Sequence, residues 1–129
     1  MRDILLFTKN PMVYADCEQA ILAGIKNVDA NQKESFWSTS KVFWNLDIYN
    51  ETIFENATDP DYIQELTEWA NTIPIKDPYI NYMGIHRSID AKRVIKVLMT
   101  LYPELYVFKD DDAPWQGTAQ EFLDTEFDF

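Results

Sequence analysis

Glycine and cysteine are scarce in this sequence, and long apolar runs are missing from it. Three glycines among 129 residues leave no glycine-rich loop of the kind that cradles phosphate groups. The single cysteine, Cys17, excludes an internal disulfide and a cysteine-based zinc cluster. No apolar run approaches the roughly 20 residues that a membrane-spanning helix needs. We therefore expect neither a phosphate-loop enzyme nor a disulfide-stabilised domain, and no membrane association.

Histidine is as scarce as cysteine, since His86 is the only one. No Ser-His-Asp order, HExxH motif or zinc-deaminase motif accompanies it, so we predict no catalytic residue, no metal site and no cofactor. One alternative stays open. His86, Arg87 and Ser88 lie where a predicted strand ends and a predicted helix begins, which is where α/β folds bind anions. A small enzyme could use these three residues on an anionic substrate.

Basic residues are outnumbered two to one. The chain carries 22 acidic and 11 basic residues, a net charge of −11. Such a field repels nucleic acid and anionic membranes and attracts basic partners. Seven acidic residues and no basic one lie between Val42 and Ile75, and seven more, again with no basic one, lie between Asp110 and Phe129. Each segment is either a solvated acidic surface or a docking surface for a basic protein.

The region from residue 79 to residue 109 has the clearest secondary-structure pattern. Residues 79–85 place apolar side chains on both faces of a strand. Ser88 is positioned to cap a helix, whose apolar residues recur at helical spacing until Pro103 ends it. Residues 105–108 form an apolar run of strand length. We predict that these two strands form a parallel pair joined by a right-handed crossover.

Two further helix starts and a final short helix are indicated by capping residues. Asn10-Pro11 and Asp59-Pro60 each combine a capping side chain with a first-turn proline. Thr118 and Glu121 have the spacing of a capping box. Each pattern predicts that a helix begins at that point.

Strand patterns at residues 4–7 and 41–49 and a polar loop at 27–35 complete the prediction. The expected fold class is α+β or α/β, a single small domain covering residues 1–129. It has about four strands with helices packed on the sheet, including a C-terminal β-α-β-α unit.

The acidic segments supply the predicted partner-binding residues. On the helix that follows Asp59, like charges three and four residues apart cost about 0.2–0.5 kcal/mol per pair, which suggests that a partner compensates for them. Tryptophan beside carboxylates is typical of an interface anchor, although Trp115 could instead pack against the last helix. We predict that a basic partner contacts Asp61, Glu65, Glu68, Asp110, Asp111, Asp112 and Trp115.

The stretch GIHRSIDAKRVIKVLMTLYPELYVFKDDD, followed by Trp115 and residues 118–123, resembles bacterial toxin-immunity proteins as a class. Those proteins are often small, acidic, aromatic-rich cytoplasmic domains encoded beside contact-dependent or polymorphic toxins. The resemblance implies a non-enzymatic inhibitor that occludes the active or substrate-binding site of a basic toxin domain, often a nuclease. A DNA-mimic regulator is a further alternative. We expect a cytoplasmic protein, because the N-terminal run ILLF is too short for a secretion signal.

Overall fold

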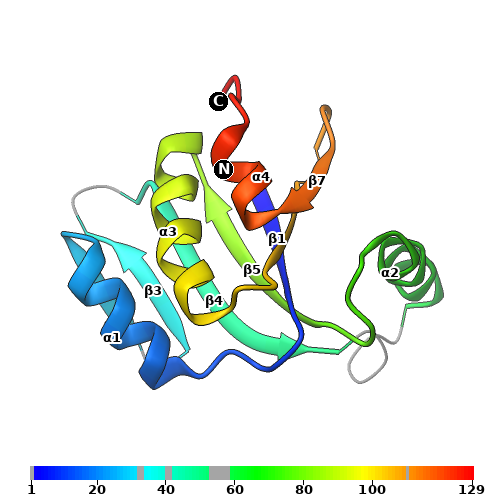
Figure 1. Cartoon of the computed structure of the whole chain (residues 1–129), viewed down its shortest axis with the longest axis horizontal. Coiled ribbons are helices and arrows are strands. Elements are labelled where there is room, and N and C mark those ends of the chain that lie inside the picture. The colour runs from blue at the N-terminus through cyan, green and yellow to red at the C-terminus, as the bar shows by residue number, and fades with distance from the viewer. Residues whose placement is uncertain (1, 32–33, 40–41, 53–58, 110) are drawn as a thin grey trace.

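The computed structural model describes residues 2–31, 34–39, 42–52, 59–109 and 111–129, which hold seven strands and four helices. The strands are β1 (Arg2–Thr8), β2 (Val28–Asn31), β3 (Ser35–Ser38), β4 (Trp44–Glu51), β5 (Tyr79–Ile85), β6 (Tyr106–Lys109) and β7 (Trp115–Thr118). The helices are α1 (Tyr14–Gly24), α2 (Pro60–Thr72), α3 (Ser88–Leu101) and α4 (Ala119–Asp124). All strands belong to one sheet, in the order β2-β3-β4-β5-β1-β6-β7 (Figure 1).

Every pair of neighbouring strands in this sheet is antiparallel. The sequence-based fold, about four strands with a C-terminal β-α-β-α unit, is therefore wrong, since β7 also lies between β6 and α4. Most of the predicted loop at 27–35 belongs to a hairpin made by β2 and β3. The missed strands β2, β3 and β7 have four residues each. Such short strands are defined by backbone hydrogen bonds to their neighbours, not by a long apolar pattern.

The predicted parallel pair is separated by the first strand of the chain. Strand β1 pairs with β5 on one side and with β6 on the other, so that Leu6 lies opposite both Asn81 and Val107. Strands β5 and β6 therefore run in the same direction but do not pair with each other. The strand-helix-strand order follows from local pattern, whereas the insertion of β1 depends on a segment more than 70 residues away in the sequence.

Helices cover the two faces of the sheet unequally (Figure 1). Ile4 and Leu6 of β1 point into a core that includes residues of α1, α3 and α4. The alternate residues Leu5 and Phe7 point to the opposite face, where Trp69 of α2 packs. One face therefore carries three helices, and the other carries α2 alone.

Two of the predicted helix starts are confirmed together with their capping residues. The side chain of Asp59 accepts a hydrogen bond from the backbone N–H of Asp61 at 3.0 Å, and Pro60 is the first helical residue of α2. Thr118 and Glu121 form a complete capping box at the start of α4. Both starts depend on residues close together in the sequence, which is why local pattern predicts them.

One further predicted start is wrong, and at the other only the predicted capping residue is wrong. Helix α1 begins at Tyr14 rather than at Asn10-Pro11, because tertiary hydrogen bonds hold the preceding backbone. The backbone N–H of Val13 donates to the hydroxyl of Tyr102 at 2.8 Å, which keeps Val13 extended. Helix α3 begins at Ser88 as predicted, but the Ser88 side chain does not cap it, since its hydroxyl donates to the backbone carbonyl oxygen of Phe129 at 2.8 Å.

Candidate functional site

Strand β4 bulges where it passes Asn81 of β5, because residues 48–50 all lie opposite that single residue. The Oδ1 atom of Asn81 accepts hydrogen bonds from the backbone N–H groups of Tyr49 and Asn50, each at 2.8 Å. Asn50 has a φ of 49°, a left-handed conformation that asparagine adopts more readily than most residues. Bulges re-aim side chains, and the Tyr49 side chain next to this one is 54% exposed.

Two asparagine side chains hold the bulge in place. The Nδ2 atom of Asn81 donates to Oδ1 of Asn50 at 3.1 Å. Asn50 in turn donates to the carbonyl oxygen of Met12 at 2.9 Å and accepts from the Met12 N–H at 2.8 Å. Asn81 is fully buried and Asn50 is half-buried, so the bulge is tied through these two side chains to the segment before α1.

Three carboxylates act on the exposed phenol of Tyr49. The negative charge of Asp47 is the largest cause of its raised pKa, followed by burial and by the charges of Glu34 and Glu51. The ring of Tyr49 lies against Tyr82, with ring centroids 6.4 Å apart. The exposed ring of Tyr49 therefore packs against Tyr82 and lies close to three negative charges.

Neutral donors hold the carboxylates of β4. Asp47 accepts hydrogen bonds from Ser35 at 2.6 Å and from the side chain of Asn45 at 2.8 Å. Glu51 accepts from the hydroxyl of Tyr82 at 2.6 Å. Neither carboxylate forms an ion pair within the described part of the chain. Hydrogen bonds from neutral groups orient these carboxylates but leave their charge uncompensated.

Helix α2 extends the same negatively charged surface. The predicted residues Asp61, Glu65 and Glu68 are all exposed, and none of them is ion-paired to another described residue. The hydroxyl of Tyr62, next to Asp61, lies 2.8 Å from the hydroxyl of Tyr82 on β5. This contact places the first turn of α2 beside β5, and Tyr82 in turn donates to Glu51 of β4.

The resulting surface is here named the acidic face. The elements β3, β4, β5 and α2 contain no lysine or arginine. The acidic face consists of Glu34, Asp47, Tyr49, Glu51, Asp61, Glu65 and Glu68.

Sequence reasoning found the α2 part of the acidic face and missed the part on β4. Asp47 and Glu51 belong to the acidic segment, and the alternation of residues 41–49 places Asp47 and Tyr49 on one side of a strand. That alternation was the available signal. The bulge that exposes Tyr49 has no local signature, because it depends on Asn81.

The second predicted cluster is divided by internal ion pairs. Asp111 accepts from Lys109 at 2.6 Å and from Arg2 at 3.0 Å. The hydrogen bond from Lys109 is the main reason that the pKa of Asp111 lies below its usual value. Asp112 is exposed, and Asp110 lies outside the described residues. Because the charge of Asp111 is already compensated, we do not include this cluster in the acidic face.

Trp115 packs against α4 and the residues that follow it. Its ring meets those of Phe122 and Phe127 edge-on, with centroids 5.5 Å apart in both cases. Gly117 lies directly beneath, where a β-carbon would come within 2.7 Å of the Trp115 ring. Trp115 is half-buried, so it packs against α4 and the residues after it while part of the residue remains exposed.

The three residues of the alternative enzyme site point into different surroundings. His86 is exposed, and its side chain makes no hydrogen bond to any other described residue. Arg87 donates through Nε to Asp90 at 3.0 Å. The hydroxyl of Ser88 donates to the carbonyl oxygen of Phe129. Arg87 and Ser88 therefore hold separate structural contacts, and the three side chains do not form one cluster.

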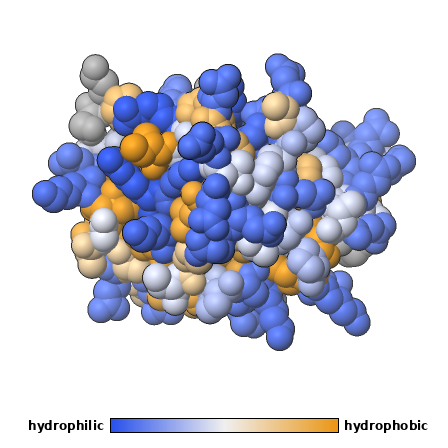
Figure 2. Space-filling model, turned by 45° about the horizontal axis from the view of Figure 1, so that its top comes forward, coloured by the Kyte–Doolittle hydropathy of each residue, from blue (hydrophilic) through white to orange (hydrophobic). Residues whose placement is uncertain are grey.

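Among the described residues, no group of three or more His, Cys, Asp or Glu side chains is arranged to hold a metal ion. Within that same part of the chain, no helix combines the length and apolarity needed to cross a membrane. On the face shown in Figure 2, hydrophilic residues predominate and hydrophobic residues form small, separated areas. Comparisons of the chain with protein-family models, with curated proteins and with solved structures find no significant match.

Proposed function

We propose that this protein is a non-enzymatic immunity protein of the cytoplasm, which neutralises a basic toxin domain such as a nuclease by covering its active or substrate-binding site. The observation that supports this most directly is the acidic face. Its six carboxylates lie on or beside elements that contain no lysine or arginine. In the described part of the chain, none of the six takes part in an ion pair.

Such a surface suits a basic partner in two ways. Uncompensated carboxylates steer a positively charged protein toward the correct encounter and raise its association rate, most strongly at low ionic strength. The exposed ring of Tyr49 offers an aromatic anchor of the kind that supplies buried energy at interfaces. It can also bind an arginine or lysine of the partner through its face.

The asparagine-bound bulge adds preorganisation. Tyr49 and Asn50 are held through their backbone by the buried side chain of Asn81. The carboxylate of Asp47 is oriented by two side-chain donors. A surface whose geometry is set before binding loses less conformational entropy in the complex, which favours tight inhibition without turnover.

The same charge pattern would suit a DNA-mimic regulator, the alternative that differs only in its partner. No described contact favours the enzyme alternative, because His86, Arg87 and Ser88 do not converge. His86 is also not among the residues that line the cavity beside the start of α3. The experiment below therefore separates a toxin domain from a nucleic-acid-binding regulator.

The test measures association of the purified chain with the basic protein encoded in the neighbouring reading frame, by stopped-flow kinetics at several salt concentrations. The test variant reverses three carboxylates of the acidic face: Asp61→Lys, Glu65→Lys and Glu68→Lys. The matched control makes the same charge change at three exposed carboxylates near the C-terminal end: Asp124→Lys, Glu126→Lys and Asp128→Lys.

We expect the test variant to associate about tenfold more slowly at low salt and to show a flatter salt dependence, with much smaller effects in the control. Co-expression should also protect cells from the partner, and the test variant should lose that protection. Equal losses of association rate in both variants would show that the net charge of the protein, and not the acidic face, attracts the partner. A partner that lacks toxicity and is displaced from duplex DNA would favour the DNA-mimic alternative.

A further inference from the structure

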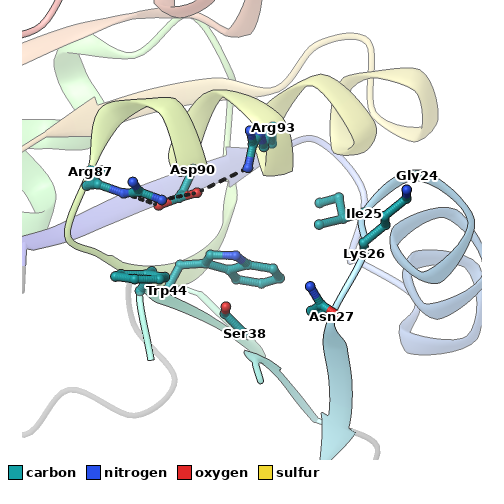
Figure 3. Close-up of a pocket in the computed structure, with 10 residues that line it drawn as sticks. Gly24, Ile25, Lys26, Asn27, Ser38, Trp44, Arg87, Asp90 and Arg93 are labelled. Carbon is teal, nitrogen blue, oxygen red and sulfur yellow. Dashed lines mark hydrogen bonds and ion pairs between the residues drawn. The ribbon is translucent and has the colours of Figure 1, made fainter. Parts of the chain in front are cut away.

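A cavity of about 400 Å³ lies between the C-terminal end of α1, the strands β3 and β4, and the first turns of α3. Arg87, Asp90 and Arg93 form a row along α3, and the indole ring of Trp44 lies across from them (Figure 3). Ser38 of β3 contributes a hydroxyl to the strand side of the cavity. The volume is near the lower end of the range of small-molecule sites, about 300–1,000 Å³.

The charge of this cavity is opposite to that of the whole protein. Its lining contains three cations, Lys26, Arg87 and Arg93, and one carboxylate, Asp90. The chain as a whole has twice as many acidic as basic residues. Positive charge is therefore gathered at one concave site of an otherwise strongly negative molecule.

Asp90 leaves most of the arginine donors unused. Arg87 donates to it through Nε at 3.0 Å and Nη2 at 3.4 Å, while Nη1 of Arg93 lies 3.6 Å from its Oδ1. A guanidinium group has five N–H donors. The two arginine side chains are 53% and 61% exposed, whereas Asp90 is 5% exposed. The buried carboxylate therefore positions two exposed guanidinium groups, each of which keeps N–H donors that Asp90 does not use.

The cavity also offers apolar contact beside these donors. Trp44 and Phe43 of the β4 region and Ile25 after α1 line it, and the Phe43 ring supports the guanidinium of Arg87 at 4.6 Å from its centroid. An aromatic ring stacked against an arginine restrains the orientation of its planar guanidinium group. Polar and apolar groups thus meet in one small volume.

We infer that this cavity binds a small organic anion, in which a phosphate or carboxylate group is attached to a planar or apolar body. The oxyanion would be bound by Arg93 and Arg87, because paired N–H groups match the geometry of both kinds of oxyanion. The body of the molecule would lie against Trp44 and Ile25. The site is separate from the acidic face, since α1 and α3 cover the sheet face opposite to α2.

The test is an NMR titration of the ¹⁵N-labelled full chain, observing the arginine Nε–H and tryptophan indole N–H resonances. The probes are phenyl phosphate and benzoate. Sodium chloride at matched ionic strength controls for charge screening, and benzyl alcohol controls for the apolar body alone. We expect saturable shifts at Arg87, Arg93 and Trp44 with at least one of the two anions, and whichever anion binds more tightly identifies the oxyanion class.

Two variants keep the Arg87–Asp90 pair and therefore the fold of the first α3 turn: Arg93→Gln and Lys26→Gln. Each should weaken binding of the anion, by about tenfold for Arg93→Gln. Lys96→Gln removes the same charge from α3 outside this cavity and should leave binding unchanged. Shifts that fail to saturate, that sodium chloride or benzyl alcohol reproduces, or that persist undiminished in both variants would overturn the inference.

Discussion

The hydroxyl oxygens of Tyr62 on α2 and Tyr82 on β5 lie 2.8 Å apart. Because Tyr82 donates its single proton to Glu51 at 2.6 Å, Tyr62 must be the donor between the two phenols. Burial, followed by the hydrogen bonds with Glu51 and Tyr62, raises the pKa of Tyr82 far above its usual value. The phenol of Tyr82 therefore stays protonated at neutral pH. The relay of hydrogen bonds from Tyr62 through Tyr82 to Glu51 joins α2 to the β4 side of the acidic face.

Replacing Tyr62 by phenylalanine should loosen α2. The substitution Tyr62→Phe removes one hydrogen bond and keeps the ring, so we expect a loss of about 1 kcal/mol in the free energy of unfolding. Amide hydrogen exchange should show faster opening of α2 than of α3. Tyr106→Phe is the control, because the Tyr106 hydroxyl makes a longer, exposed bond of 3.3 Å to Gln116. Equal effects of the two changes would argue against the relay.

Asn81→Ala should collapse the bulge in β4. The change removes the acceptor of two backbone N–H groups, those of Tyr49 and Asn50, at a fully buried position. We expect a loss of about 2–3 kcal/mol in urea unfolding, since unsatisfied buried donors are costly. The control is Asn45→Ala, which breaks a side-chain bond to Asp47 between two half-buried residues. If Asn81→Ala were as mild as the control, the bulge would not depend on this residue.

Asp111→Asn should destabilise the protein at neutral pH and much less in acid. Lys109 is only 5% exposed and pairs with Asp111, so removing the carboxylate leaves a buried cation, at a cost of about 3 kcal/mol. The lowered pKa of Asp111 means that its contribution is present above its ordinary value of 3.8 and is lost as the pH falls through the folded pKa.

The measurement for Asp111→Asn is urea unfolding of the original chain and the variant between pH 7 and pH 2. The difference in unfolding free energy should be largest near pH 7 and should shrink below about pH 4. Asp112→Asn, at the exposed neighbouring position, should change little at any pH. A constant difference across the whole pH range would show that ionisation of Asp111 is not its cause.

Gly117→Ala should displace the ring of Trp115. The new β-carbon would lie 2.7 Å from a ring carbon, so the indole must move away from Phe122 and Phe127. We expect a loss of about 1–3 kcal/mol in stability and a weaker near-ultraviolet circular dichroism signal. Gly24→Ala is a gentler control, because its β-carbon would meet one methyl of Val97 at 3.0 Å. An unchanged aromatic signal in Gly117→Ala would contradict this packing.

Sequence reasoning succeeded where the signal is local. The strand predicted at residues 79–85 is β5 without change, and the caps of α2 and α4 are as expected. It failed for the helix start at Asn10-Pro11 and for the capping role of Ser88, where partners from distant parts of the chain take the hydrogen bonds. Capping and periodicity involve residues within a few positions of each other, whereas strand order and bulges do not.

Composition alone establishes that this chain cannot neutralise itself, because 11 basic residues face 22 acidic ones. Folding settles which carboxylates are compensated and which are not. Asp111 meets Arg2 from 109 positions away, while Asp61 stays exposed on a helix without a cation. The reason is geometric: an ion pair or a strand pair needs two segments in register, and that register depends on the whole sheet rather than on either segment.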